Sequence, residues 1–157
     1  GKAFGDLVVK GPWIVSDYYN NPSEESFIKL GEDLWFRTGD VVSIDPDGYI
    51  KITDRSKDVI KSGGEWISSI ELENTAMAHP KVKEAAVIAI KDVKWDERPL
   101  LIIVKKDHVE LEESDILSFF KDKVAKWCIP DKVIFTEEIP HTATGKILKT
   151  KLRELYS

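Results

Sequence analysis

The spacing of apolar residues changes near residue 57, and this change limits the folds that the chain can adopt. Before it, strand-like segments alternate with turns, and no amphipathic helix long enough to cover them begins before residue 68. A sheet whose apolar face stays uncovered is not stable by itself. We therefore interpret residues 1–56 as the β-rich end of a larger domain, and residues 57–157 as a separate unit of helices and strands.

Two segments carry the strand prediction before residue 57. The stretch DLVVKGPWIV, residues 6–15, is rich in β-forming residues but is interrupted by Gly11-Pro12, which indicates two short strands or one bent edge strand. The stretch DVVSIDPDGYIKIT, residues 40–53, alternates well on both sides of a central Asp-Pro-Asp-Gly. Proline at the second turn position and glycine at the fourth favour a type I turn, so this stretch is predicted to be a β-hairpin.

Three helices are predicted after residue 57. The first begins at Ser68, which forms a capping-box pair with Glu71, and ends at His79-Pro80. The second covers residues 112–127, and the third is the short segment 148–155. The residues predicted to share a face on these three helices are, in turn, Ile70, Asn74 and Met77; Leu117, Phe120, Val124 and Trp127; and Leu148, Leu152 and Leu155.

Three apolar segments between these helices are predicted to be strands, over residues 83–92, 98–106 and 131–139. The predicted fold class is therefore α+β: a small C-terminal domain of about 100 residues with a three-stranded sheet and packed helices, preceded by the β-rich segment.

The composition excludes several classes of function. A net charge of −5 argues against a chain that coats nucleic acid, because a basic surplus supplies most of that affinity. The C-terminus is basic, but a run of charge is more often a solvated helix face than a phosphate-binding tail. Its basic residues are Lys146, Lys149, Lys151 and Arg153.

The chain offers few signals of location. Its one cysteine, Cys128, rules out an internal disulfide framework, suits a reducing compartment and is predicted to be a small buried thiol rather than a nucleophile. Apolar runs stay shorter than the roughly 18 residues of a membrane helix, and the first residues have no signal-peptide pattern. Cytoplasm is the expected location. Without an initiator methionine and with an immediate strand, the sequence is expected to be a piece of a longer protein.

Three local patterns could carry chemistry. The stretch FRTGD, residues 36–40, is predicted to place the carboxylate of Asp40 on a turn that Gly39 allows to bend tightly. The stretch DRSKDVIKSGGEWISSIELE, residues 54–73, combines charged residues with Gly63-Gly64, whose backbone freedom allows a close approach of ligand or a large rearrangement. Each is also compatible with an ordinary solvated turn.

The third pattern is a Thr- and Gly-rich loop, PHTATGK, which presents Lys146 ahead of a helix. It resembles a phosphate cradle but is not a Walker loop, because Pro140 stands where the first glycine should be and Ile147 replaces the Mg²⁺-binding hydroxyl residue. Lys146 is then a point charge on a flexible stem. The three histidines, His79, His108 and His141, are scattered without ligand partners at suitable spacing, so a metal site is not expected.

In this order and spacing, the three patterns resemble the adenylate-forming family of acyl-CoA synthetases, peptide-synthetase adenylation domains and firefly luciferase. The resemblance runs essentially from end to end. FRTGD matches the family's Tyr-Arg-Thr-Gly-Asp signature with Phe36 for Tyr, the stretch from Asp54 matches its hinge signature with Asp54 for Gly, and PHTATGK matches its closing Pro-x-Thr-x-x-Gly-Lys. The stretch GDLVVKGPWIVSDYY is similar to the family's Gly-Glu-Leu strand region, with Asp17 where glycine is usual.

Two further stretches, KWDERPLLIIV and IPHTATGKILKTKLRE, are most similar to the medium- and long-chain acyl-CoA ligases, including those acting on methylthio-propionate. The resemblance implies two half-reactions. A carboxylate attacks the α-phosphate of Mg-ATP to give acyl-adenylate and pyrophosphate, and the thiol of CoA then attacks the adenylate to give acyl-CoA and AMP. The implied cofactors are ATP, CoA and Mg²⁺, with the Mg²⁺ ligands outside this chain.

The resemblance also implies roles for individual residues. Asp40, Arg55 and Thr38 would bind the nucleotide, with the carboxylate of Asp40 accepting from both ribose hydroxyls. Lys146 would lie between the attacking carboxylate and the α-phosphate, where a cation stabilises the developing charge. The C-terminal unit would then turn about a hinge at Lys57.

In the second pose, a different part of the chain would face the adenylate. The resemblance implies that Gly63, Gly64 and Trp66 belong to the channel for the pantetheine arm of CoA, with Lys61 as a catalytic aid on the same face. Trp66 stands where some relatives carry a cation, so the phosphates of CoA must be bound by other groups.

Two alternatives stay open on the sequence. One is a stand-alone α+β interaction module whose basic tail and tryptophans bind a partner or RNA; the other is an adenylation domain that loads a carrier protein. The chain length of the acyl substrate and the oligomeric state are not encoded in these residues, although a missing N-terminal domain could mediate oligomerisation. Without the pyrophosphate loop, adenine pocket and acyl tunnel, the 157 residues alone are expected to be inactive.

Overall fold

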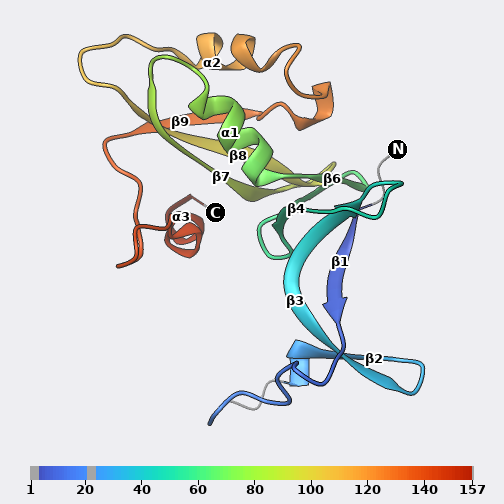
Figure 1. Cartoon of the computed structure of the whole chain (residues 1–157). Coiled ribbons are helices and arrows are strands. Elements are labelled where there is room, and N and C mark those ends of the chain that lie inside the picture. Colours follow the sequence, from blue (N-terminus) through green and yellow to red (C-terminus); the bar gives the residue numbers. More distant parts are fainter. Residues whose placement is uncertain (1–3, 21–23, 157) are drawn as a thin grey trace. The chain divides into compact units, whose positions relative to one another are not determined.

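The computed structural model describes residues 4–20 and 24–156. The chain divides into two compact units, unit 1 from Gly1 to Lys57 and unit 2 from Asp58 to Ser157 (Figure 1). Residues 1–3, 21–23 and 157, which belong to the two predicted domains, lie outside the described residues. Each unit has its own sheet.

Unit 1 is an antiparallel sheet built around one long strand. This strand, β3, pairs with each of the other strands of the unit. A short 3₁₀ turn, Glu24–Ser26, precedes β2. The strands are β1 (Phe4–Val9), β2 (Phe27–Leu30), β3 (Asp33–Ile44) and β4 (Ile50–Arg55).

The predicted hairpin joins β3 to β4. The amide of Gly48 donates to the carbonyl of Asp45 at 3.0 Å, which closes the four-residue turn, and the carboxylate of Asp45 accepts from the amides of Asp47 and Tyr49. The hairpin prediction is therefore confirmed. The prediction of two short strands or one bent strand around Gly11-Pro12 is wrong in its second half, because β1 ends at Val9 and residues 11–14 form turns and bends.

Unit 1 has almost no core of its own. Among its described apolar residues, only Val41 and Val42 are buried. Trp35 and Phe36 of β3 are half-buried. Many other large apolar side chains of β3, β4 and their neighbours are exposed over a third or more of their surface, among them Leu30, Leu34, Ile44, Tyr49, Ile50 and Ile52. An exposed apolar surface of this kind indicates a face that another part of a protein covers.

Unit 2 contains a five-stranded sheet, not the three-stranded sheet predicted. The predicted strands are present as β7 (Val82–Asp92), β8 (Asp96–Lys105) and β9 (Lys132–Thr136). The two additional strands, β5 (Ile60–Ser62) and β6 (Glu65–Ile67), form a small hairpin that pairs with the start of β8. Each of these two strands has only three residues, which is too few to show an alternating apolar pattern. The sequence therefore did not predict them.

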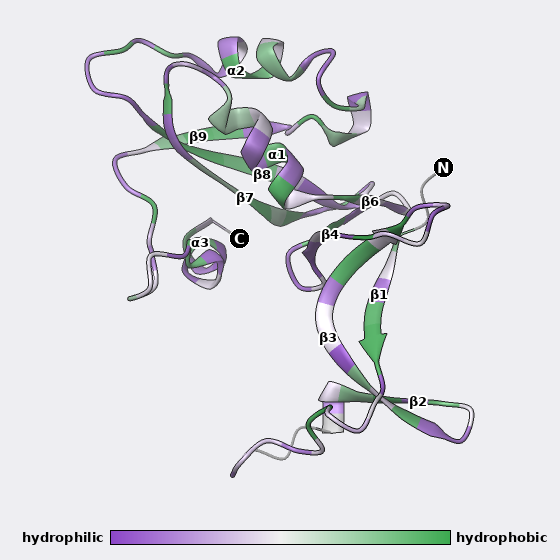
Figure 2. Cartoon of the chain, viewed as in Figure 1, coloured by the Kyte–Doolittle hydropathy of each residue, from purple (hydrophilic) through white to green (hydrophobic). Residues whose placement is uncertain are grey.

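Helices cover both faces of this sheet. α1 (Ser69–Met77) and α2 (Glu113–Phe120) lie on one face and α3 (Lys149–Tyr156) on the other (Figure 1). Along β8, Leu101 and Ile103 pack into the cluster under α1 and α2, whereas Leu100 and Ile102 pack into the cluster with Leu152 of α3. Burial on both faces explains the unbroken apolar run of this strand, which Figure 2 shows as continuous hydrophobic colour.

The helix predictions are right in number but not in detail. Ser68 caps α1 by accepting from the amide of Glu71 at 3.2 Å. The buried face of α1 is Ser69, Leu72 and Ala76, whereas Ile70, Asn74 and Met77 lie on the exposed side.

The second helix is shorter than the predicted residues 112–127. α2 ends at Phe120, because Lys121 leaves the helical conformation and Asp122 has a left-handed backbone with φ of 69°. Of the predicted stripe, Phe120 is buried, Leu117 and Val124 are half-buried and Trp127, in a separate 3₁₀ turn (Lys126–Cys128), is 57% exposed. In α3, Leu152 is buried and Leu155 is 58% exposed.

Candidate functional site

The FRTGD stretch forms a bulge inside β3, so the predicted turn is wrong. Register slips between Asp6 and Val8 of β1, opposite this stretch, and Gly39 has a φ of 75°. The Thr38 hydroxyl donates to the carbonyl of Leu7 at 3.0 Å and accepts from the amide of Asp40 at 3.1 Å. A bulge in a strand re-aims a side chain without ending the sheet, and here the side chain so placed is that of Asp40.

Two of the predicted nucleotide-binding residues are direct neighbours. Asp40 of β3 and Arg55 of β4 are register partners, and the guanidinium of Arg55 contacts the carboxylate of Asp40 at 2.6 Å. The Asp40 side chain is 18% exposed and that of Arg55 is 55% exposed. Thr38, the third predicted residue, uses its hydroxyl inside the sheet and therefore fixes the bulge that carries Asp40.

The predicted hinge residue, Lys57, is the last residue of unit 1. It lies in a turn that follows β4. The residue before it is tied to unit 1, because the Ser56 amide donates to the carbonyl of Gly39 and its hydroxyl donates to the carboxylate of Asp6. The residue after it, Asp58, belongs to unit 2, where it accepts from Arg153 of α3. The connection between the two anchored residues is therefore one residue long.

The predicted channel residues lie together on the β5–β6 hairpin. Gly63 and Gly64 form its two-residue turn with φ values of 59° and 87°, and positive values at both positions are what a type I′ turn requires. Lys61 and Trp66 are register partners just before and after the turn, so their side chains share one face.

A tryptophan that the sequence did not single out contacts this turn. A methyl group built on Gly63 would meet the ring of Trp95 at 2.7 Å, and the Gly63 amide donates to the carbonyl of Trp95 at 2.8 Å. A methyl group on Gly64 would meet nothing within 4 Å. The side of the turn at Gly63 is thus closed by Trp95, and the side at Gly64 is open.

Substitution of these glycines is expected to have unequal effects on stability. Gly64→Ala adds left-handed backbone strain alone, at about 1–2 kcal/mol. Gly63→Ala adds the same strain and also displaces the Trp95 ring, which raises the loss by about 1 kcal/mol. Equilibrium urea unfolding of each variant measures the difference, and equal losses would show that the Trp95 contact does not constrain the turn.

The PHTATGK loop closes on itself ahead of α3. The amide of Thr142 donates to the carbonyl of Lys146 at 2.7 Å, the amide of Lys146 donates to the Thr142 hydroxyl at 3.1 Å, and Leu148 donates to the carbonyl of Pro140 at 2.8 Å. Gly145 supplies the tight reversal with a φ of 80°. Lys146 is exposed, its backbone is fixed on both sides, and its ammonium group has no ion-pair or hydrogen-bond partner in the described part of the chain.

The basic C-terminal segment is not a uniformly solvated face, which corrects the prediction. Lys149 contacts Glu73 of α1 at 2.7 Å, with both side chains about 15% exposed, and it donates to the Ser69 hydroxyl. Arg153 pairs with Asp58 at 2.5 Å. Lys151 pairs with Glu154 on the open surface. The contacts of Lys149 and Arg153 fix α3 to the rest of unit 2. Lys146 is therefore the basic residue of this segment whose ammonium group has no partner in the described residues.

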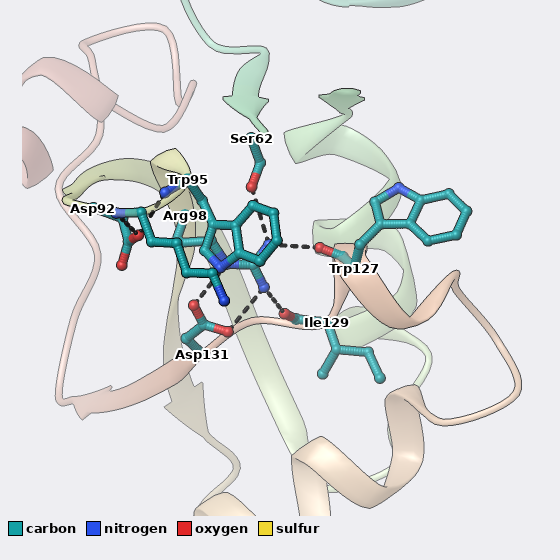
Figure 3. A network of polar contacts seen from close by, with 8 residues as sticks. Ser62, Asp92, Trp95, Arg98, Trp127, Ile129 and Asp131 are labelled. Atoms are coloured by element: carbon teal, nitrogen blue, oxygen red, sulfur yellow. Dashed lines mark hydrogen bonds and ion pairs between the residues drawn. The ribbon is translucent and has the colours of Figure 1, made fainter. Parts of the chain in front are cut away.

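A buried arginine, missed on the sequence, joins three parts of unit 2 (Figure 3). Arg98 of β8 is 8% exposed and binds Asp131 through two nitrogens at 2.6 and 2.8 Å. It also donates to the Ser62 hydroxyl of the hairpin and to the carbonyls of Trp127 and Ile129. The hydrogen bond from Asp131 raises the pKa of Arg98. Its five donors are thereby used to fix the hairpin and the 127–131 segment.

The remaining candidate residues show no sign of a second reactive centre. Burial raises the pKa of the Cys128 thiol, which disfavours the reactive thiolate. Burial also lowers the pKa of His79, whose ring packs edge-on against Phe119. Within residues 4–20 and 24–156, His, Cys, Asp and Glu side chains form no group of three or more that could hold a metal ion. In the same residues, each helix is too short or too polar to cross a membrane.

Comparison with known proteins assigns this arrangement to a class. Residues 71–146 match the family model of the AMP-binding enzyme C-terminal domain. The chain contains the small C-terminal domain of the AMP-binding, or adenylate-forming, enzymes. This confirms the family resemblance and the α+β fold class expected from the sequence.

The relatives within this class are CoA ligases. The chain is 54% identical over 98% of its length to 3-methylmercaptopropionyl-CoA ligase from Ruegeria lacuscaerulensis, and 52% identical over 99% to medium-chain-fatty-acid–CoA ligase from Ectopseudomonas oleovorans. The crystal structure of ATP-bound MatB from Rhodopseudomonas palustris aligns over 98% of the chain with a TM-score of 0.84 and 32% identity. The chain spans 28% of the length of both curated relatives and 30% of the MatB chain.

Proposed function

We propose that this chain is the C-terminal part of an ATP-dependent, AMP-forming acid–CoA ligase. The observation that carries the proposal is Lys146: its loop is rigid, the lysine and arginine that follow it on α3 are paired, and its own ammonium group faces outward without a partner in the described residues. A cation on a hydrogen-bonded loop, with no anion of its own in the described residues, suits a transient, negatively charged substrate.

In the first half-reaction, the substrate carboxylate attacks the α-phosphate of ATP, and the bond from that phosphorus to the bridging oxygen of pyrophosphate breaks. Lys146 reduces the repulsion between the two anions and stabilises the charge on the transferring phosphoryl group. Asp40 accepts from the ribose hydroxyls, and Arg55, which contacts Asp40 at 2.6 Å, orients that carboxylate and reaches the same ribose. Mg²⁺ would be held by residues outside this chain.

In the second half-reaction, the thiol of CoA attacks the acyl carbon and AMP leaves. Unit 2 turns about Lys57, which removes Lys146 and brings the β5–β6 hairpin to the adenylate. The turn at Gly63-Gly64 then lines the path of the pantetheine arm, which passes on the open side at Gly64, where a methyl group would meet nothing within 4 Å. Lys61 and Trp66, on one face of the hairpin, flank this path.

The proposed substrate is a fatty or thioether-substituted alkanoic acid. The similarity to ligases named for 3-methylmercaptopropionyl-CoA and for medium-chain fatty acids supports this class. A carrier-protein thiol is the rival acceptor, and the same relatives favour CoA over it.

A substrate screen of the full-length protein tests the proposal. We expect pyrophosphate release that requires ATP and an alkanoic acid and that continues over many turnovers only when CoA is added, with carboxylic acids of graded length compared against the thioether acid. The 157-residue chain alone should release none, because the walls that position the substrates are absent. Transfer to a carrier protein but not to CoA would favour the rival acceptor, and a full-length protein without acid-dependent turnover would exclude a ligase.

A further inference from the structure

The loop that presents Lys146 is tied to the central sheet by a contact at its base. The ring of His141 and the carboxylate of Glu84 on β7 lie 2.5 Å apart, with exposed fractions of 36% and 29%. His141 also forms a β-bridge with Ile147, on the opposite side of the loop. The contact therefore acts where the two arms of the loop come together.

The rest of the loop transmits this contact to Lys146. Hydrogen bonds between the arms make the loop a closed ring, and Ile139 and Ile147 pack into the apolar cluster beneath it. On the far side, Lys149 binds Glu73, whose carboxylate also accepts from the amide of Val87 on β7. Both ends of the loop are thus connected to β7: His141 contacts Glu84 directly, and Lys149 is linked through Glu73 to the amide of Val87.

We propose that the Glu84–His141 pair positions Lys146 for adenylate formation. The hydrogen bonds within the loop keep its shape, and the Glu84–His141 contact holds its base against β7. Loss of this contact would therefore let the whole loop rotate as a rigid unit. The direction in which Lys146 extends would then change more than the internal structure of the loop. Displacement of a catalytic group by about 1 Å can cost about 100-fold in rate. Neither Glu84 nor His141 touches substrate, and the inference rests on the proposed role of Lys146.

The pair should matter to one half-reaction only. Lys146 acts in adenylation and is carried away before the thiol attacks, so misdirection of its loop leaves the second half-reaction unaffected. A pair exposed to this extent contributes little to folding. A contact that served general stability would instead affect both half-reactions together.

The experiment compares the two half-reactions in the full-length protein. Glu84→Ala is expected to lower kcat for acid-dependent ATP–pyrophosphate exchange about 10- to 100-fold, with KM for ATP little changed. Thioester formation from supplied acyl-adenylate and CoA should stay within about twofold of wild type. Glu84→Gln, which retains an oxygen acceptor for His141, should recover most of the exchange rate, and Glu154→Ala, which opens the exposed pair with Lys151, is the matched control.

Partner variants separate the outcomes. His141→Ala leaves β7 intact, should reproduce the loss, and should add little when combined with Glu84→Ala, since both remove one contact. Unchanged exchange in both variants, or equal losses in the two half-reactions, would overturn the positioning role of the pair. The proposed function would still stand in that case, provided that the wild-type protein is active. Absence of exchange in the wild-type protein would overturn the proposed function and this inference with it.

Discussion

Lys146→Ala in the full-length protein should lower adenylate formation about 10²- to 10³-fold. In the proposed first half-reaction, the side chain supplies a positive charge where the carboxylate and the α-phosphate approach, and hydrogen bonds within the loop hold the backbone that carries it. The substitution removes the charge from an exposed position, so stability should hardly change. ATP–pyrophosphate exchange in the presence of the acid measures this step.

The same variant should retain thioester formation from supplied acyl-adenylate and CoA. In the proposed second half-reaction, unit 2 has turned about Lys57 and Lys146 is outside the site. Lys151→Ala is the control, since Lys151 lies five residues further along the same basic segment and pairs with Glu154. If Lys146→Ala impaired both steps equally, the assignment of this lysine to the first step would be wrong.

Arg98→Ala should destabilise unit 2 by about 3–4 kcal/mol. Removal of the guanidinium leaves the carbonyls of Trp127 and Ile129 without their donor and releases the hairpin at Ser62 (Figure 3). Asp131, which is 53% exposed, can turn to water and contributes the smaller share. Urea unfolding followed by tryptophan fluorescence measures the loss.

This loss should be independent of pH across the neutral range. The hydrogen bond from Asp131 raises the pKa of Arg98 above its already high ordinary value, so the stabilisation is fully present below the unfolded-state pKa and is lost only as pH rises through the higher folded-state pKa. The difference between wild type and variant should thus be constant from about pH 6 to 9. Lys151→Ala, which opens an exposed pair, should change stability by less than about 1 kcal/mol. A similarly small effect of Arg98→Ala would mean that the network does not hold the hairpin.

Part of unit 1 and much of unit 2 could be predicted because their signals are local. The Ser68 cap, the Asp45–Gly48 turn and the long strands β7 and β8 each follow from residues within a few positions of one another. The family motifs also contained the candidate residues, and the structure places Asp40 beside Arg55, and Lys61 opposite Trp66. The nucleotide, hinge and channel roles of these residues remain predictions.

The missed features depend on residues far apart in the sequence. In the sequence, Arg98 is one charged residue in a strand, and its partners Ser62, Trp127 and Asp131 are brought to it only by folding. Glu84 and His141 are likewise separated by 57 positions. The turn predicted at Gly39 is a bulge because Leu7, in another strand, accepts from Thr38. An arginine followed by proline within an apolar strand was the available signal for the buried network, and it does not name the partners.

A distance measurement across Lys57 tests the central claim, that a turn at this residue alternates two faces of unit 2. Spin labels replace Lys51 in unit 1 and Lys83 in unit 2 of the full-length protein, both of which are exposed. The account predicts one distance with ATP and a non-reactive acid analogue, and a distinctly different one with an acyl-adenylate analogue and CoA. One unchanged distance in both states would contradict it.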